Sequence, residues 1–362
     1  MNVRVATILL WAFWGGTGCS TLGYYGQAAS GHLEVMAASR PLGSVIEDPA
    51  TPTKVRERLR VAADARRFAS TDLGLPDNGS YRSYADLGRD AVVWALYAAP
   101  EFDVEPHRWC YPFVGCLAYR GFFDLDEARD VAKRYAARGM DTYIAPVPAY
   151  STLGWFDDPL LNTMMRWDDT SVAALVFHEL AHQVVYVADD TEFNEAFAVT
   201  VEREGVRRWL ESRGRSAQLH EWRARKAAAA ELVRMMLALR ADLDALYAGA
   251  SAHDRGSTPG ARKGALIEAV RERFRKQART RRELEPFAHW FGPGLNNARL
   301  NVFAVYERWV PAFAALLARE EGDMSRFFIA VKRLGRLDQE ERARQLRELA
   351  ELADELAEPG TR

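Results

Sequence analysis

The sequence predicts an α+β protein that is predominantly α-helical, in which a helix pair and a small β-sheet are surrounded by further helices. Three observations support this class. Apolar residues recur at helical spacing over most of the chain. Between Asp90 and Val147 the pattern changes to short apolar or β-branched runs, which are typical of strands. No Pro/Ser-rich linker divides the 362 residues into separate domains.

The first residues have the pattern of a secretory signal. Arg4 precedes an apolar run over residues 5–14, which is too short for a lasting transmembrane helix. Because the residues before Cys19 resemble a lipobox, we expect removal of residues 1–18 and lipidation of Cys19, with ordinary signal cleavage as the alternative. Ser20 after the cysteine indicates a lipid-anchored protein of the bacterial cell envelope, at the outer membrane and facing the periplasm.

Residues 19–362 are expected to form a single unit. It comprises an amino-terminal helical part at 19–88, a core of sheet and paired helices at 89–214, and a carboxy-terminal helical part at 215–362. A net charge of −2 and a pI near 6.4 provide no basic surface for nucleic acid. No other apolar segment is long enough to span a bilayer, and no pattern indicates the oligomeric state.

The remaining elements follow in chain order. Helices are expected at residues 22–40 and 54–68. Strands are expected at 91–98, 117–123 and 142–147, with a helix between the last two that opens with a capping box at Asp124 and ends before Gly139. After the helix pair, helical patterns cover residues 217–247, 262–282, 299–319 and 339–356.

The helix pair is expected on either side of a short polar turn. Apolar positions recur at helical spacing over residues 171–186, after N-cap candidates at 168–170. Residues 189–191 interrupt this pattern, and a second amphipathic helix then continues to about Gly214. An antiparallel pair is the simplest arrangement.

The first of these helices carries the motif His178-Glu179-Leu180-Ala181-His182. Residues four apart lie on one face of a helix about one turn apart, so His178 and His182 can bind the same cation. Glu179 is the usual residue to accept a proton from an activated water. The alternative is a chance motif, in which both histidines are ordinary core or surface residues.

Glu195 on the second helix is the best candidate for a third ligand. His182 lies about seven residues before the turn and Glu195 about five after it, so their heights along the antiparallel pair differ by only roughly 3 Å. Glu192 ranks lower because it lies in the first turn, and Glu202 ranks lower still because it has passed the histidines by about a turn. Asp189 would require the turn to fold back.

At these positions the sequence resembles the gluzincin metallopeptidases, in which two motif histidines and a glutamate from the next helix bind zinc. Asn194-Glu195-Ala196-Phe197-Ala198 resembles the third-ligand motif of the large zinc aminopeptidases. Much of the chain also resembles a family of bacterial aminopeptidases predicted to be lipoproteins. The shared landmarks are Cys19, Cys110 and Cys116 before Tyr119-Arg120-Gly121-Phe122, the histidine motif, and Asn296-Asn297-Ala298-Arg299-Leu300.

Two departures from the large aminopeptidases bear on specificity. The gap between His182 and Glu195 is shorter here, which implies a compact site. Those enzymes also carry a Gly-x-Met-Glu-Asn segment before the zinc helix, whose glutamate helps to hold the substrate amine. Residues 151–156 contain no such glutamate, and Gly154 is the expected substrate-binding position. In gluzincins this region provides an exposed edge strand for the substrate backbone, so we expect peptide to add to the strand at 142–147.

The resemblance implies hydrolysis assisted by one zinc ion, held by His178, His182 and Glu195, with Glu179 as general base. The reaction also needs a donor for the oxyanion. Tyr306 is the first candidate, although an aromatic residue packed in a helix core is an equal interpretation of it. Tyr150 and His289 are alternatives.

Asn296, Asn297 and Arg299 follow a turn at residues 291–294 and open an apolar helix. Their side chains are suited to hold a peptide backbone or a carboxylate, which predicts a substrate-binding role. A helix cap would explain one of them instead.

Cys110 and Cys116 remain after Cys19 is assigned to lipidation. In an exported protein they can form a disulfide across a short loop. A second metal site is the rival interpretation, but only His107 lies near in the sequence and the spacing is not that of a zinc ribbon.

These patterns predict a zinc-dependent peptidase, with an aminopeptidase acting on peptide substrates as the first choice. An envelope endopeptidase with the same mechanism is the alternative. A non-catalytic, partner-binding lipoprotein with a structural zinc site is the third, although Glu179 and a site of only three protein ligands argue against it.

Overall fold

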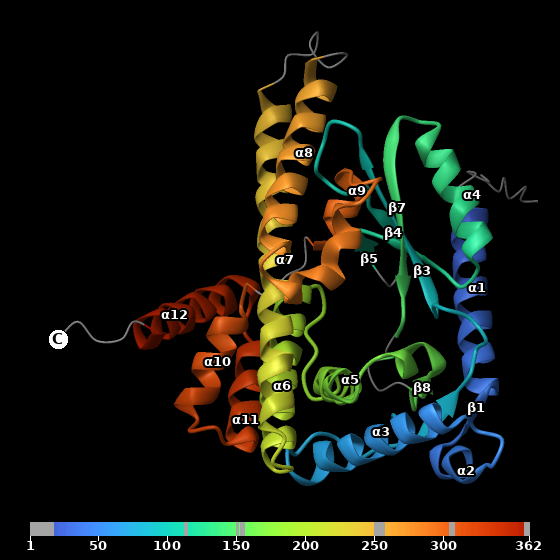
Figure 1. Cartoon of the computed structure of the whole chain (residues 1–362), viewed down its shortest axis with the longest axis vertical. Helices are drawn as coiled ribbons and strands as arrows, with labels where there is room; N and C mark the ends of the chain where they lie inside the picture. The colour runs from blue at the N-terminus through green and yellow to red at the C-terminus, as the bar shows by residue number, and fades with distance from the viewer. Residues whose placement is uncertain are drawn as a thin grey trace, which may run out of the picture.

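The computed structural model describes residues 18–111, 115–149, 152, 156–249, 258–303 and 308–357. The fold is α+β and predominantly helical, which confirms the predicted class (Figure 1). A small sheet with α1 and α4 lies on one side of the long helices α7 and α8, and α10 to α12 lie on the other side.

The helices and strands have the following bounds. The α-helices are α1 (Gly18–Ala37), α2 (Leu42–Glu47), α3 (Thr53–Thr71), α4 (Leu125–Ala136), α5 (Asp169–His182), α6 (Thr191–Glu211), α7 (Ser216–Ala248), α8 (Thr258–Ala278), α9 (Asn297–Leu300), α10 (Val310–Arg319), α11 (Met324–Gly335) and α12 (Gln339–Ala357). The 3-10 helices are η1 (Asn162–Arg166), η2 (Arg282–Phe291) and η3 (Asn301–Phe303). The strands are β1 (Ser39–Pro41), β2 (Ser83–Ala85), β3 (Val93–Pro100), β4 (Trp109–Tyr111), β5 (Gly115–Leu117), β6 (Arg120–Phe122), β7 (Met140–Val147) and β8 (Leu160–Leu161).

The sheet beside the helix pair has the order β6-β3-β7, and its strands are antiparallel. Its predicted strands at 91–98 and 142–147 correspond to β3 and β7, with boundaries shifted by about two residues. The single strand predicted at 117–123 is wrong, because β5 pairs with β4 in a hairpin whereas β6 pairs with β3. A change of partner between the two segments breaks the strand. A second sheet has the order β1-β2-β8.

The helix predicted over residues 299–319 is also wrong. The chain forms α9 and η3 there, and α10 begins only at Val310. Pro311 lies in the first turn of α10, where its missing N–H is unneeded, whereas inside a continuous helix it would remove a backbone hydrogen bond. The remaining predicted helices are present with shifted ends, and α2 and α11 are additional.

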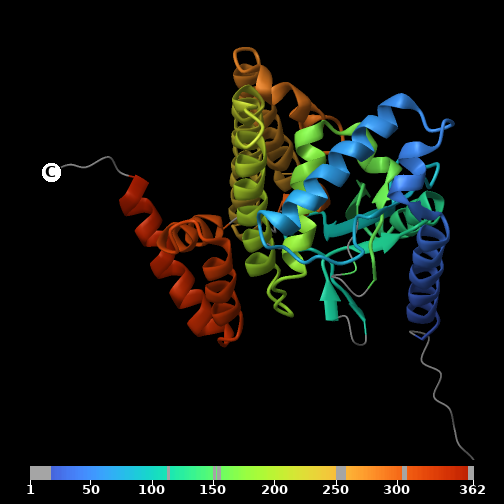
Figure 2. The same ribbon diagram turned by 90° about the horizontal axis from the view of Figure 1, so that it is seen from below.

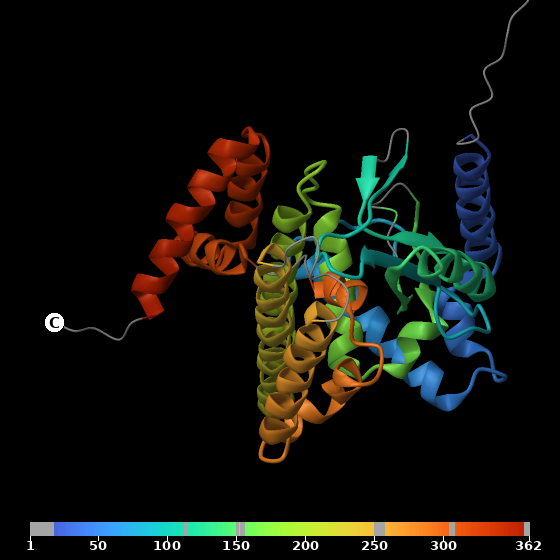
Figure 3. The same cartoon turned by 90° about the horizontal axis from the view of Figure 1, so that it is seen from above.

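The helix pair lies within the largest hydrophobic core. Phe177 of α5 and Phe193 and Phe197 of α6 are fully buried, and each such ring contributes about 2–3 kcal/mol by leaving water. Phe313 of α10 packs edge-on against Phe193, with ring centroids 5.1 Å apart. The three last helices therefore attach to the pair through α6, while most of their bodies project to one side (Figures 2 and 3).

A search of the described helices finds none that is both long enough and apolar enough to cross a membrane. The division into residues 1–18, 19–88, 89–214 and 215–362 stays a prediction.

Candidate metal centre

The turn between α5 and α6 fixes how the two helices face each other. Asp189 adopts a left-handed φ of 60°, and Asp190 caps α6 by accepting a hydrogen bond from the N–H of Phe193 at 3.1 Å. The buried Asn194 side chain accepts a hydrogen bond from the N–H of Val187 at 2.8 Å and donates one to its carbonyl at 2.7 Å. These contacts hold the pair in one register.

A side chain of the last helix braces this turn. Arg342 of α12 is 5% exposed, and its Nε donates to Oδ2 of Asp190 at 2.7 Å across 152 residues of sequence. Its Nη1 donates to the carbonyl of Leu337 at 2.6 Å. Because a buried ion pair is expensive to break from one side, α12 stabilises the start of α6.

His178, His182 and Glu195 direct their ligand atoms toward a common point. The Nε2 atoms of the two histidines are 3.2 Å apart. Oε2 of Glu195 lies 3.3 Å from Nε2 of His178, and its Oε1 lies 3.6 Å from Nε2 of His182. The structure thus brings together the three residues chosen from the sequence, and this group could hold a metal ion. Glu192 instead lies 4.0 Å from Arg308, and Asp189 is exposed in the turn.

Glu202 supports His178 from its other ring nitrogen. Oε2 of Glu202 lies 3.2 Å from Nδ1 of His178, and its Oε1 forms an ion pair with Lys226 of α7. A carboxylate at this nitrogen fixes the tautomer and orientation of a ligand histidine. Reasoning on the sequence weighed Glu202 only as a ligand and missed this role. The available signal was its position two helical turns after Glu195, on the same face of α6.

The two histidines have opposite pKa shifts. Burial disfavours the charged form of both rings. At His178 the hydrogen bonds to Glu195 and Glu202 outweigh burial and raise the pKa to about 10. At His182 burial, together with the charge on His178, lowers the pKa to about 4. The His178 ring therefore carries a positive charge between the carboxylates of Glu195 and Glu202. A cation is electrostatically favoured at this position.

His178 and Glu195 line a cavity of about 690 Å³, a size that suits a small ligand. The other lining residues come from β3, from the hairpin strand β5, from the segments before β4 and after β5, from α6 and α7, and from η3. They are Tyr97, Pro106, Arg108, Cys116, Leu117, Ala118, Tyr119, Thr191, Val199, Glu202, Lys226, Asn301 and Val302. None of the eight residues of β7, all of which are described, lines this cavity. The strand expected to receive substrate therefore does not border this cavity. In its sheet, β7 is an outer strand and is separated from β6 by β3.

Glu179 lies beside the three ligand residues without joining them. It is half-buried and lines a neighbouring cavity of about 390 Å³ together with His178 and Glu202. Both cavities share His178, Glu202 and Lys226. Glu179 thus lines the cavity that adjoins the candidate metal position.

Tyr119 is a polar residue of the cavity that sequence reasoning did not select. Its ring packs near Tyr97, with centroids 5.7 Å apart. Burial of the hydroxyl group and the negative charge of Glu195 raise the pKa of Tyr119, so the group stays protonated and can donate a hydrogen bond. The stretch that begins at Tyr119 was a landmark of the family resemblance, which was the available signal.

Asn296, Asn297 and Arg299 have partners within the protein. Asn296 caps α9 by accepting a hydrogen bond from the N–H of Arg299 at 2.9 Å, so the cap expected for one of the three is present. Asn297 is 0% exposed, and its Nδ2 lies 2.9–3.0 Å from the carbonyls of Pro100, Glu101 and Asp103. Nη2 of Arg299 donates to the carbonyl of His289 at 2.8 Å. These contacts support a structural role, and none of the three lines the 690 Å³ cavity.

Other residues predicted for the site fall elsewhere. Tyr306, Tyr150 and Gly154 lie outside the described residues, as does the signal segment up to residue 17. The described part of α1 includes the backbone of Cys19 but not its side chain. His289 is exposed, and its Nδ1 is 2.9 Å from the carbonyl of Pro286.

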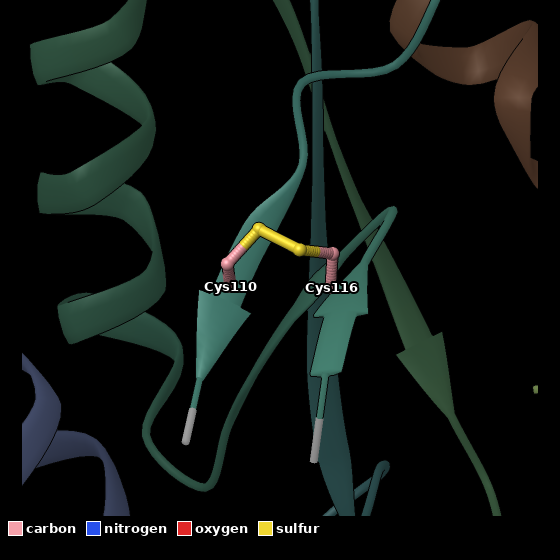
Figure 4. The surroundings of a disulfide bond; sticks show 2 residues. All are labelled: Cys110 and Cys116. Atoms are coloured by element: carbon pink, nitrogen blue, oxygen red, sulfur yellow. A yellow bond between two sulfur atoms is a disulfide. The ribbon is translucent and has the colours of Figure 1, made fainter. Parts of the chain in front are cut away.

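Cys110 and Cys116 are joined by a disulfide, the pairing expected from the sequence (Figure 4). The bond links β4 to β5, where the two residues lie directly opposite each other. Cys116 and Leu117 line the 690 Å³ cavity. The disulfide therefore constrains one wall of the candidate site.

Residues 23–346 match the model of a family described as "Putative aminopeptidase". No curated protein and no solved structure matches the chain.

Proposed function

Since this chain belongs to the family described as "Putative aminopeptidase", we propose that it is a zinc-dependent peptidase of the gluzincin type. One zinc ion would be held by His178, His182 and Glu195.

The spacing of the donor atoms is the observation that carries this proposal. A tetrahedral zinc ion with ligand distances of about 2.0–2.1 Å keeps its ligand atoms about 3.3–3.4 Å apart. The two histidine Nε2 atoms here are 3.2 Å apart, and each lies near one oxygen of Glu195, His178 at 3.3 Å from Oε2 and His182 at 3.6 Å from Oε1. Two nitrogens and one carboxylate are a common donor set of catalytic zinc sites, which leave the fourth position open.

When bound, the ion supplies a Lewis acid that polarises the scissile carbonyl and makes water a better nucleophile. Glu179 accepts the proton of that water and passes it to the leaving amine. Glu202 and Lys226 keep the His178 ring oriented, and the disulfide-linked hairpin bounds the substrate space. Each step needs a residue that already lies in or beside one of the two adjoining cavities.

A hydrogen-bond donor must also stabilise the oxyanion. Tyr119 fits this requirement because its hydroxyl group stays protonated near Glu195. Tyr306 remains a candidate from the sequence.

Aminopeptidase activity is the first choice, and an endopeptidase is the second. The acidic residues among the described lining of the 690 Å³ cavity are Glu195 and Glu202, and both already face His178. A free substrate amine would therefore lack an uncommitted carboxylate among these residues, which favours a substrate recognised along its backbone. Leucine p-nitroanilide and an internally quenched peptide with blocked ends separate the two activities.

The proposal includes export and lipidation at Cys19, which would place the enzyme at the outer membrane facing the periplasm. Metabolic labelling with a palmitate analogue tests this, because a Cys19→Ala protein should lose the label. Labelling that persists in that variant would contradict it.

The decisive experiment compares the wild type with His178→Ala and Glu179→Gln, by metal analysis and by peptide hydrolysis. We expect Glu179→Gln to keep zinc and to lose activity by about 100- to 10,000-fold, because it removes the general base. His178→Ala should lose both zinc and activity.

Glu192→Gln is the matched control. This exposed acid lies on the same helix as Glu195 but outside the donor group, so its variant should keep zinc and activity. A wild type without bound metal, or a fully active Glu179→Gln protein, would refute the proposed function.

A further inference from the structure

Asn301, the first residue of η3, is a buried amide without a hydrogen-bond partner. It is 3% exposed, and neither its Nδ2 nor its Oδ1 has a partner among the described residues. An unpaired buried polar group is destabilising, and both ends of this side chain are in that condition. Such a group in a native protein calls for a partner beyond the described residues.

Asn301 lines the same cavity as the candidate metal centre. His178 and Glu195 form one part of its lining, and Asn301 and Val302 form another. Asn297, one turn earlier, is equally buried, but its amide is hydrogen-bonded to backbone carbonyls and to the hydroxyl group of Tyr247. Among the described residues, partners are therefore present for the side chain of one buried asparagine and absent for that of the one at the cavity.

We propose that Asn301 is a substrate-binding residue that pairs with a backbone peptide group of the substrate. Its Nδ2 donates to a substrate carbonyl, and its Oδ1 accepts a hydrogen bond from a substrate N–H. This inference rests on the proposed peptidase function and specifies how that enzyme recognises its substrate.

The chemistry of the side chain and of its surroundings favours a peptide group. A carboxamide presents one donor end and one acceptor end, which is the complement of a peptide unit. The cavity wall beside Asn301 includes the apolar Val302, and Leu117 and Val199 also contribute apolar surface. A hydrogen bond to a side chain that is only 3% exposed is stronger than one in water. A neutral ligand that offers both groups satisfies both ends of Asn301.

The test replaces Asn301 with leucine, which has a similar size and no hydrogen-bonding group. Kinetics are measured with tetra-alanine, and peptide binding is measured by calorimetry with a Glu179→Gln protein that does not turn substrate over. We expect Asn301→Leu to raise KM for tetra-alanine, and to weaken its binding to the inactive protein, by about 10- to 100-fold. We expect kcat to stay within about threefold and bound metal to stay at the wild-type level.

Thermal stability separates a substrate-binding role from a purely structural one. A structural role of Asn301 would lower the melting temperature of the variant. Removing an unsatisfied buried amide should leave the melting temperature of Asn301→Leu equal to or above that of the wild type. Asn297→Leu is the matched control, because it removes a satisfied amide from the same segment and should lower the melting temperature without changing KM. If leucine disturbs packing, Asn301→Ala should show the same rise in KM.

The outcomes distinguish this inference from the proposed function. An active wild type whose Asn301→Leu and Asn301→Ala variants keep KM within about twofold would overturn the role of Asn301 and leave the peptidase standing. A change confined to kcat would do the same. A wild type that neither cleaves nor binds any peptide would overturn both.

Discussion

The helix pair and the segment from Asn296 to Arg299 both present a cluster of polar side chains on helical structure, but the two regions use them differently. In the pair, the polar atoms of His178, His182 and Glu195 converge on one point at the edge of a cavity. In the segment, the polar atoms of Asn297 are bound by backbone groups of the loop after β3. One region keeps its donors and acceptors for a ligand, and the other uses them to join parts of the fold.

The difference shows that the type of a polar residue does not indicate its role. Whether its side chain has hydrogen-bond partners is more informative. Asn297 and Asn301 are the same residue type in adjacent turns and have nearly equal burial. The hydrogen bonds of their side chains separate them: the side chain of Asn297 has several, and that of Asn301 has none among the described residues. Unpaired or cavity-facing polar groups are therefore the better guide to function in this protein.

Asn297→Ala should have the largest effect on folding. The substitution removes a fully buried amide and leaves its carbonyl partners without their donor, so we expect a loss of about 3 kcal/mol in the free energy of unfolding. Urea unfolding monitored by circular dichroism measures this loss. The comparison of the two regions predicts unchanged kcat and KM in the folded fraction. A normal stability with an altered KM would break the comparison and favour a substrate-binding role for Asn297.

Glu202→Gln should have the next largest effect, on metal affinity. Loss of the carboxylate at Nδ1 of His178 removes the group that orients this ring, and we expect zinc to bind about 10- to 100-fold more weakly. Competition with a chromogenic chelator measures the affinity.

Glu204→Gln is the control for Glu202→Gln, because Glu204 lies on the same helix but pairs with Arg207 and Arg208 at 2.6 Å. Its zinc affinity should match that of the wild type. Equal affinities in all three proteins would show that Glu202 does not support the metal ligand.

Asn296→Ala should have the smallest effect. It removes the cap of α9 and a hydrogen bond to the carbonyl of Thr142 at 3.2 Å, which predicts a loss of about 1 kcal/mol of stability. Asn296→Asp keeps the capping oxygen and should recover most of this loss. The same urea unfolding experiment measures both variants, and an aspartate variant as unstable as the alanine variant would argue against the cap.

The sequence predicted best those features that depend on residues close together in the chain. The positions of His178, His182 and Glu195 follow from helical spacing on two helices joined by a short turn. Asp124 caps α4 by accepting a hydrogen bond from the N–H of Glu127 at 2.8 Å, which is one of the two bonds of the predicted capping box. The fold class and most helices could be predicted for the same reason.

Features that depend on distant partners could not be predicted. The amide of Asn297 is held by carbonyls almost 200 residues earlier in the chain, and no local pattern contains that information. Glu202 acts through Lys226 of another helix as well as through His178. The strand predicted at 117–123 was divided because its two halves pair with different neighbours.

The ion pair between Arg342 and Asp190 has a consequence for biosynthesis. Arg342 lies 152 residues after Asp190 in the chain, yet it braces the turn that precedes Glu195. A nascent polypeptide still emerging from the ribosome can form both histidine- and glutamate-bearing helices long before this arginine is available. The turn between them gains its buried counter-ion only after the 152 residues that follow Asp190 have been made, so this part of the centre matures later than the two helices themselves.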